Sequence, residues 1–150
     1  MTKQESQQVD VICSVYNPNP TSLLKSVQSV LAQTYLSFKL VLVDDGSTDG
    51  TREVLKKLEQ DEVRIVFHEK NKGKGAAVRT GYQHAKGEFV TIQDADLELN
   101  PDEIPSLLKP LLEGTADVVY GSRFVFGFNH RSKLNAFANW FLSGLTNILY

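Results

Sequence analysis

Residues 38–50 read FKLVLVDDGSTDG, an apolar run that ends in an acidic, glycine-containing turn. The run from Phe38 to Val43 is short, almost wholly apolar and typical of a buried strand. The turn after it carries good helix caps, because the side chain of Ser47 or Asp49 can accept hydrogen bonds from the first amides of a helix. This stretch therefore predicts a strand, a turn and a helix, the unit from which parallel sheets are built.

The same unit repeats on both sides of this stretch. Four further runs predict strands, and they are Val9 to Val15, Val63 to Phe67, Glu88 to Ile92 and Ala116 to Tyr120. Apolar residues at helical spacing fill the intervals between the strands. Five strands alternating with four helices predict right-handed βαβ connections and a mostly parallel sheet, and hence an α/β fold.

The composition bounds the class of protein. The chain has 150 residues, 41% of them hydrophobic and 23% charged, which suits one globular domain. Its formal net charge of -2 argues against a general nucleic-acid binder, since such proteins carry a large positive excess. Cys13 is the only cysteine, so no internal disulfide is possible and a reducing, cytoplasmic location fits. We expect residues 1–8 to be a polar tail without a signal peptide, residues 9–150 to be the domain, and no segment to span a membrane.

Polar clusters follow the expected strands. They are Tyr16-Asn17, Asp44-Asp45, the basic loop 70–75, Asp94 with Asp96, and Arg123. The carboxyl ends of parallel strands meet at one edge of the sheet, and ligands bind there, so the clusters predict a single site. Asp44 and Asp45 can accept hydrogen bonds from ribose hydroxyls or from a base N–H, unless they serve only the turn.

Asp94 and Asp96 are two residues apart, so their side chains point the same way in extended backbone. Two carboxylates so placed can share a hard divalent cation, Mg²⁺ or Mn²⁺, and Glu98 continues the spacing as a third candidate ligand. A solvated turn explains an Asp-x-Asp pair about as well, so both interpretations stay open. His68 and His84 lack metal-ligand spacing, and we expect them to be ordinary histidines.

The loop 70–75, KNKGKG, is basic and opens an expected helix, whose amino end favours anions. It is neither a Walker loop nor a dinucleotide fingerprint, because the glycine spacing of both is missing. Arg123 can hold a phosphate through two hydrogen bonds, and His130 and Arg131 add positive charge close by in the sequence. An ordinary solvated surface is the alternative for the loop and for Arg123.

Taken in order, five motifs resemble the inverting GT-A glycosyltransferases of family 2. They are SVYN at 14–17, VDDGSTDGT at 43–51, NKGKGA at 71–76, QDADLE at 93–98 and GSR at 121–123. The closest likeness is to the dolichol-phosphate (polyprenyl-phosphate) mannosyl- and glucosyltransferase branch, and it covers nearly the whole chain from Val9 to Tyr150. The resemblance implies a GT-A (Rossmann-like) three-layer αβα fold with a mostly parallel central sheet.

The resemblance also implies roles for the matching residues. Those implied to bind the nucleotide sugar are Ser14, Tyr16, Asn17, Asp44, Asp45, Lys72, Gly73, Lys74, Arg79 and Asp94. Those implied to bind the metal are Asp94, Asp96 and Glu98, and those implied to be catalytic are Asp94, Asp96 and Arg123. The candidates for the acceptor are Arg123, His130 and Arg131. Within the nucleotide set, Asp45 would bond the base, with Asp44 beside it.

The implied reaction moves a sugar, with inversion and with Mg²⁺ or Mn²⁺, from GDP-mannose or UDP-glucose to a lipid phosphate. A phosphate acceptor fits because no unassigned general base stands out. The alternative is a chain that binds a nucleotide sugar without turnover, since it ends before a segment that the family carries and is expected to be truncated. Residues 132–150 repeat apolar side chains at helical spacing, which predicts a helix that packs on the domain or lies on the cytoplasmic face of a membrane.

Overall fold

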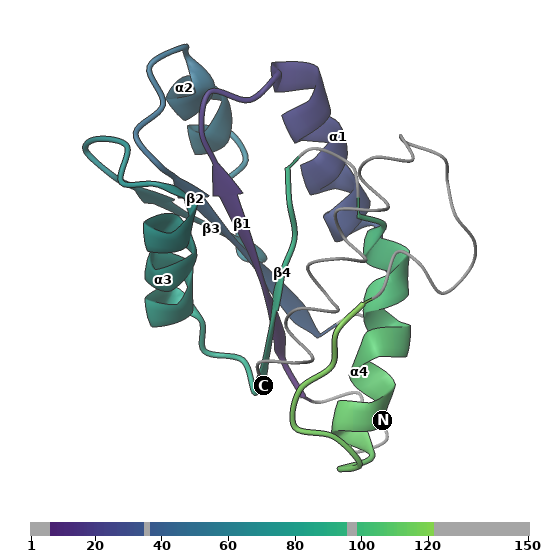
Figure 1. The fold of residues 1–150 in the computed structure, drawn as a ribbon. Helices are drawn as coiled ribbons and strands as arrows, with labels where there is room; N and C mark the ends of the chain where they lie inside the picture. Colours follow the sequence, from purple (N-terminus) through teal and green to yellow (C-terminus); the bar gives the residue numbers. More distant parts are fainter. Residues whose placement is uncertain (1–6, 35–36, 96–98, 122–150) are drawn as a thin grey trace, which may run out of the picture. The chain divides into compact units, whose positions relative to one another are not determined.

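Among the residues that the computed structural model describes, 7–34, 37–95 and 99–121, four parallel strands form the centre of the fold (Figure 1). The strands are β1 (Val9–Val15), β2 (Phe38–Asp44), β3 (Val63–Phe67) and β4 (Phe89–Ile92). They lie in the order β3-β2-β1-β4, and every neighbouring pair is parallel. The first four predicted strands are confirmed, each to within one residue at its ends.

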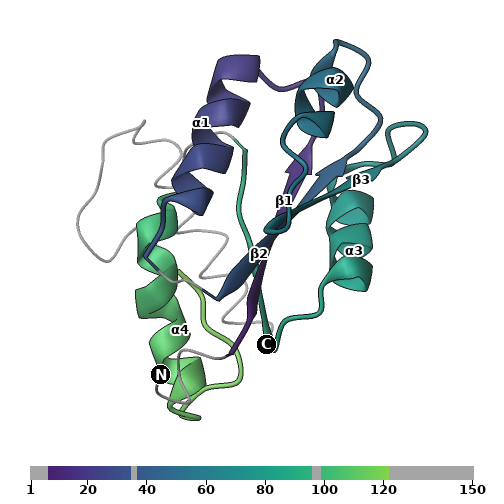
Figure 2. The same ribbon diagram turned by 180° about the vertical axis from the view of Figure 1, so that it is seen from behind.

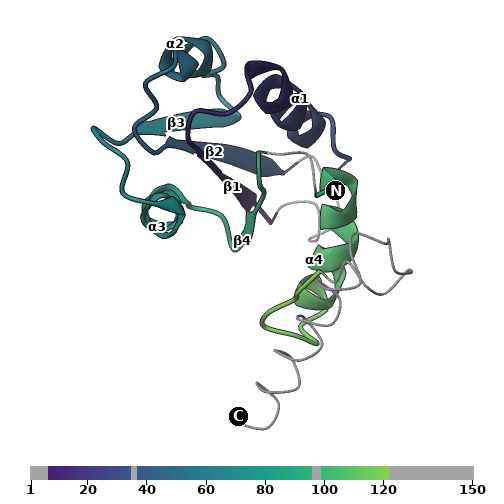
Figure 3. The ribbon, with the colours of Figure 1, turned by 45° about the horizontal axis from the view of Figure 1, so that its top comes forward.

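Helices cover both faces of this sheet. They are α1 (Pro20–Leu31), α2 (Thr51–Lys56), α3 (Lys74–His84) and α4 (Ile104–Leu112), with a short 3-10 turn, η2 (Pro101–Glu103), before α4. α3 packs on one face, whereas α1, α2 and α4 pack on the other (Figure 3). α1 and α4 follow one another along the sheet, as the view from behind shows (Figure 2). The predicted α/β fold, three layers around a parallel sheet, is confirmed.

The strands are nearly continuous apolar runs because helices bury both of their faces. Val11 and Leu40 pack in the core beneath α1, α2 and α4, and Ile12 packs with Ala77 of α3 on the opposite face. α3 approaches β1 closely at Gly81, where an added Cβ would lie 2.4 Å from Cγ2 of Ile12. This contact fixes α3 against the sheet, with its first residue at the carboxyl edge.

α1 begins where the sequence predicts a helix. The Asn19 side chain accepts hydrogen bonds from the N–H groups of Thr21 at 3.0 Å and Ser22 at 3.2 Å, and Pro20 occupies the first turn, where no N–H is needed. The connection from β1 to α1 is therefore short, and it keeps Tyr16 at the carboxyl edge of the sheet.

The predicted fifth strand, Ala116 to Tyr120, is wrong, because the structure assigns no strand there. The Val118 side chain remains 63% exposed. A run of β-prone residues forms a strand only when a neighbouring strand completes its hydrogen bonds. Within the described ranges, β4 pairs with β1 alone, and residues 116–121 pair with neither.

The described residues up to Val119 form one compact unit, and the site lies within it. Tyr120 and Gly121 belong to a second unit, most of which lies outside the described ranges. None of the helices in the described ranges is long and apolar enough to cross a membrane. The division into a tail at 1–8 and a domain at 9–150 stays a prediction.

Candidate functional site

A cleft of about 370 Å³ opens at the carboxyl ends of β1 and β4. The chain forms β2 and β3 on one side of β1 and later places β4 on its other side, so the connections diverge here. Parallel sheets bind ligands at such a point. The residues that line the cleft are Ser14, Val15, Tyr16, Pro18, Asn19, Ser22, Lys74, Asp94 and Ala95. Four residues predicted to bind the nucleotide sugar, Ser14, Tyr16, Lys74 and Asp94, thus share one cleft, while their roles stay predictions.

Tyr16 presents its ring at this cleft, with the side chain 51% exposed. Asn17, the next residue, has a positive φ of 41° and does not line the cleft. Its side chain accepts a hydrogen bond from the Thr48 N–H at 2.9 Å, and its own N–H donates to Ser47 Oγ at 2.9 Å. Asn17 therefore ties the loop after β1 to the loop after β2 and fixes the backbone that carries Tyr16.

Lys74 and Asp94 form an ion pair inside the cleft. The Lys74 Nζ lies 2.6 Å from Asp94 Oδ1, and the side chains are 60% and 28% exposed. The backbone of Asp94 is also held, because Ser26 of α1 donates its hydroxyl to the Asp94 carbonyl at 3.3 Å. Lys74 is the first residue of α3, where the helix amino end adds partial positive charge. The cleft thus places a cation and a carboxylate side by side.

Asp45 is engaged within the protein, although the sequence suggested that its carboxylate is left for a ligand. Residue 45 is 3% exposed. Its oxygens accept hydrogen bonds from the N–H of Lys72 at 2.9 Å, the N–H of Gly73 at 2.7 Å and Nδ1 of His68 at 2.6 Å. Burial by itself raises the pKa of the Asp45 carboxyl, but the hydrogen bonds from His68 and from the two amides outweigh it and lower that pKa below its ordinary value. Asp45 therefore holds the basic loop as a carboxylate.

Asp44, the last residue of β2, is also engaged within the protein. It is fully buried and accepts hydrogen bonds from Arg52 Nε at 2.9 Å and from the Ser47 N–H at 3.2 Å. Arg52 also donates to the carbonyl of His68 and lies 5.4 Å from the centre of the Phe67 ring. The adjacent carboxylates of Asp44 and Asp45 thus both anchor the segment that follows β3.

Two residues of this site, Arg52 and His68, escaped the sequence analysis, which treated His68 as an ordinary histidine. A usable signal existed for His68. In the parallel register, Asp44 lies opposite Phe67, so the next pair along the two strands is Asp45 and His68. A histidine placed one residue past a strand that runs beside an acidic turn is a natural partner for that carboxylate.

Residues 10–144 match the sequence profile described as "Glycosyl transferase family 2". This match covers most of the chain. The chain belongs to glycosyl transferase family 2.

Two named bacterial transferases are similar in sequence to this family 2 chain. It is 35% identical to glycosyltransferase GlyA of Streptococcus pneumoniae over 79% of this chain and 17% of that protein. It is 33% identical to the undecaprenyl-phosphate 4-deoxy-4-formamido-L-arabinose transferase of Aeromonas hydrophila, over 76% of this chain and 36% of that protein. The chain thus spans well under half the length of these relatives.

A solved structure shares the fold of this family 2 chain. It is the mannosyltransferase PcManGT from Pyrobaculum calidifontis in complex with GDP-Man and Mn²⁺. The two superpose with a TM-score of 0.62 at 30% identity, over 69% of this chain and 32% of that one. The expected GT-A architecture is therefore confirmed, whereas membership of the dolichol-phosphate branch stays a prediction.

Part of the predicted family 2 site lies outside the described residues. The residues concerned are Asp96, Glu98, Arg123, His130 and Arg131, together with the segment 132–150. Among the described residues, no group of three or more histidines, cysteines or acidic residues is placed to hold a metal ion. The Asp94 carboxylate is a hard oxygen ligand at the cleft and fits a divalent cation, although Lys74 contacts it here. Arg79, on α3, is exposed and is not among the residues that line the cleft.

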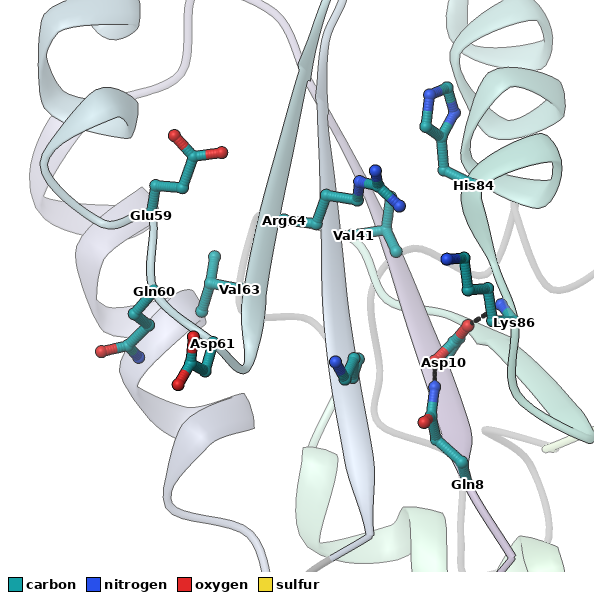
Figure 4. Close-up of a pocket in the computed structure, with 11 residues that line it drawn as sticks. Gln8, Asp10, Val41, Glu59, Gln60, Asp61, Val63, Arg64, His84 and Lys86 are labelled. Atoms are coloured by element: carbon teal, nitrogen blue, oxygen red, sulfur yellow. Dashed lines mark hydrogen bonds between the residues drawn. The ribbon is translucent and has the colours of Figure 1, made fainter.

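A second cavity, of about 300 Å³, lies at the amino ends of the strands (Figure 4). Its side chains carry both signs of charge, with Asp10 and Asp61 against Arg64 and Lys86. The buried Asp10 carboxylate already accepts hydrogen bonds from Gln8 Nε2 at 2.7 Å and from the backbone amide of Lys86. Because ligands of parallel sheets bind at the carboxyl edge, the first cleft remains the candidate site of this family 2 chain.

Proposed function

We propose that this chain binds a nucleoside-diphosphate sugar in the cleft at the carboxyl ends of β1 and β4, as part of a glycosyltransferase that moves a hexose to a lipid phosphate with inversion. The observation that carries the proposal is the meeting of Tyr16, Lys74 and Asp94 in one cleft where the sheet connections diverge. These three side chains supply an aromatic surface, a cation and a carboxylate. A nucleotide sugar offers a base to the aromatic surface and a diphosphate to the cation. Its diphosphate oxygens can share a divalent metal ion with the carboxylate.

The donor has a natural orientation in this cleft. The exposed ring of Tyr16 stacks on the base, an interaction worth about 1–3 kcal/mol in comparable base–aromatic contacts. Lys74 and the amino end of α3 hold the diphosphate, because both present positive charge. Ser14, near the end of β1, also lines the cleft and offers a hydroxyl to the nucleoside.

Two cations, a divalent metal ion and Lys74, are the candidate partners of the Asp94 carboxylate when the diphosphate binds. We assign Asp94, with Asp96 and Glu98, to hold Mg²⁺ or Mn²⁺, which when bound neutralises the negative charge of the leaving diphosphate. Lys74 must leave Asp94 Oδ1 when the donor enters, and it then has the diphosphate as a new partner. The Lys74–Asp94 pair is half-exposed, so breaking it costs about 1 kcal/mol at most.

The choice of donor sugar and of acceptor is supported by the descriptions of similar proteins. PcManGT is described with GDP-Man and Mn²⁺, which supports GDP-mannose as the first donor to test and UDP-glucose as the second. The Aeromonas relative is named for an undecaprenyl-phosphate acceptor, which supports a polyprenyl phosphate here. A phosphate oxygen is already anionic near neutral pH, so it attacks the anomeric carbon without a general base.

A second candidate is a chain that binds the nucleotide sugar without turnover. The observation that favours it is the Lys74–Asp94 contact, in which a protein cation already occupies a predicted metal ligand. Both candidates predict donor binding. Only the first predicts release or transfer of the sugar, and loss of that turnover in Asp94→Asn.

Calorimetric titration with GDP-mannose and with UDP-glucose, each with and without Mn²⁺, tests the proposal. We expect one of them to bind, and to raise the free energy of unfolding by about 2.7 kcal/mol at a ligand concentration 100 times Kd. Asp94→Asn weakens binding, whereas the matched control Asp61→Asn, at the opposite edge of the sheet, does not. Failure of both nucleotide sugars to bind the wild-type chain refutes the proposal.

A further inference from the structure

His68 is a buried histidine to which the proposed reaction gives no role. It follows β3 directly, and its side chain is 6% exposed. Nδ1 lies 2.6 Å from Asp45 Oδ1, and Nε2 lies 2.9 Å from the Thr80 hydroxyl of α3. Because a carboxylate can only accept, Nδ1 carries a proton and donates it to Asp45, while Nε2 is paired with the Thr80 hydroxyl. The ring therefore bridges a buried carboxylate and a helix with both nitrogens used.

The Asp45 carboxylate, in turn, accepts hydrogen bonds from the backbone of the basic loop. Oδ1 accepts from the Lys72 N–H at 2.9 Å, and Oδ2 accepts from the Gly73 N–H at 2.7 Å. Gly73 has a φ of +88°, which favours glycine, and it is the last residue before α3. The carboxylate plane must face both amides at once, so its rotation matters. The hydrogen bond from His68 to Oδ1 is a third contact that restrains this rotation.

The loop is also packed tightly on the turn that carries Asp45. A Cβ added to Gly46 would lie 2.4 Å from the carbonyl carbon of Lys70 and 2.5 Å from the amide nitrogen of Asn71. A shift of the Asp45 carboxylate is therefore passed directly to the loop. The loop leads directly into Lys74, the first residue of α3, whose Nζ lies in the cleft 2.6 Å from Asp94 Oδ1.

We propose that His68 is a positioning residue, which sets the Asp45 carboxylate so that the loop 70–74 presents Lys74 to the cleft. The role in ligand binding rests on the proposed function, because the loop receives the donor diphosphate there. The role in holding the loop does not, since it follows from hydrogen bonds made by the protein alone. The Thr80 hydroxyl of α3 contacts Nε2 and so orients the His68 ring from the opposite end.

Hydrogen exchange of the Lys72 and Gly73 amides, measured on the full chain without ligand, tests the role in holding the loop. His68→Leu removes the donor to Asp45, and we expect both amides to exchange about 10- to 100-fold faster, as loss of one hydrogen bond to a charged group predicts. His68→Asn keeps an N–H donor near the position of Nδ1 and restores slow exchange. The control is Val63→Ala, a core substitution in β3 that lowers overall stability without touching the loop.

Thr80→Val gives a second test if His68→Leu does not fold, because it removes only the hydroxyl that orients the ring. We expect it to speed exchange of the two amides by about threefold to tenfold, and Thr80→Ser to leave exchange unchanged. Wild-type exchange at Lys72 and Gly73 in a folded His68→Leu or in Thr80→Val overturns the proposal. So does equal acceleration in Val63→Ala, because the effect is then one of general stability.

Donor affinity measured on the same variants separates this proposal from the proposed function. If the wild-type chain binds a nucleotide sugar, His68→Leu should raise Kd about tenfold and His68→Asn should recover most of the loss. If the wild-type chain binds none, the proposed function fails, while the exchange rates still decide whether His68 holds the loop. Unchanged donor affinity in a variant with a loosened loop overturns the role in ligand binding.

Discussion

Replacing Lys74 with methionine should change metal binding and nucleotide binding in opposite directions. In the structure, Lys74 Nζ lies 2.6 Å from Asp94 Oδ1, so it competes with a divalent cation for that oxygen. The Lys74 side chain is 60% exposed, and solvent screening limits such a pair to about 1 kcal/mol. Lys74→Met should therefore strengthen the binding of Mn²⁺ alone by up to about fivefold, since about 1.4 kcal/mol is tenfold.

The same substitution removes the cation that receives the diphosphate. Loss of a charged hydrogen bond of this kind costs about 1.5–3 kcal/mol, so the nucleotide sugar with Mn²⁺ should bind at least tenfold more weakly. Calorimetry with Mn²⁺ alone, and then with the nucleotide at saturating Mn²⁺, measures both effects on one variant. Lys70→Met, an exposed lysine of the same loop that does not line the cleft, serves as the control. Weaker binding of Mn²⁺ alone, or unchanged nucleotide binding, would refute the reasoning.

Further predictions concern the remaining parts of the site. Tyr16→Ala should weaken nucleotide binding about tenfold or more by calorimetry, whereas Tyr16→Phe keeps the stacking surface and most of the affinity. The Asp45 carboxyl has a folded-state pKa below its ordinary value of 3.8, so its contribution to stability is present above about pH 4 and is lost as the pH falls through the folded pKa. Urea unfolding at several values from about pH 2 to about pH 6 should show this loss of unfolding free energy, and a smaller loss in Asp45→Asn. Arg52→Met leaves the buried Asp44 carboxylate without its cation and should cost about 2 kcal/mol of unfolding free energy, a figure reduced because Arg52 is 33% exposed. Gly46→Ala combines a φ of +81° with a clash against the Lys70 backbone, and chemical unfolding should show a loss of more than about 1 kcal/mol.

Much of the fold could be predicted from local sequence, because the deciding forces act over a few residues. The apolar runs of β1 and β3 have the predicted bounds, since strands buried on both faces must be apolar along their length. The Asn19-Pro20 pair begins α1 for local reasons of capping and fixed φ. The meeting of Tyr16 and Asp94 also followed from the sequence, because parallel strands bring their carboxyl ends to one edge.

Tertiary structure decided the partners of the polar side chains. A sequence shows that Asp44 and Asp45 lie where a strand ends and a turn begins, but it does not show which donors from other elements approach their oxygens. Arg52 comes from the next helix, α2, and His68 comes from the end of β3, which lies beside Asp45 because β3 pairs with β2. The run from Ala116 to Tyr120 failed as a strand for the related reason that local propensity supplies no hydrogen-bonding neighbour. Backbone preferences and burial are written into short stretches of chain, whereas the satisfaction of buried polar groups depends on contacts between distant ones.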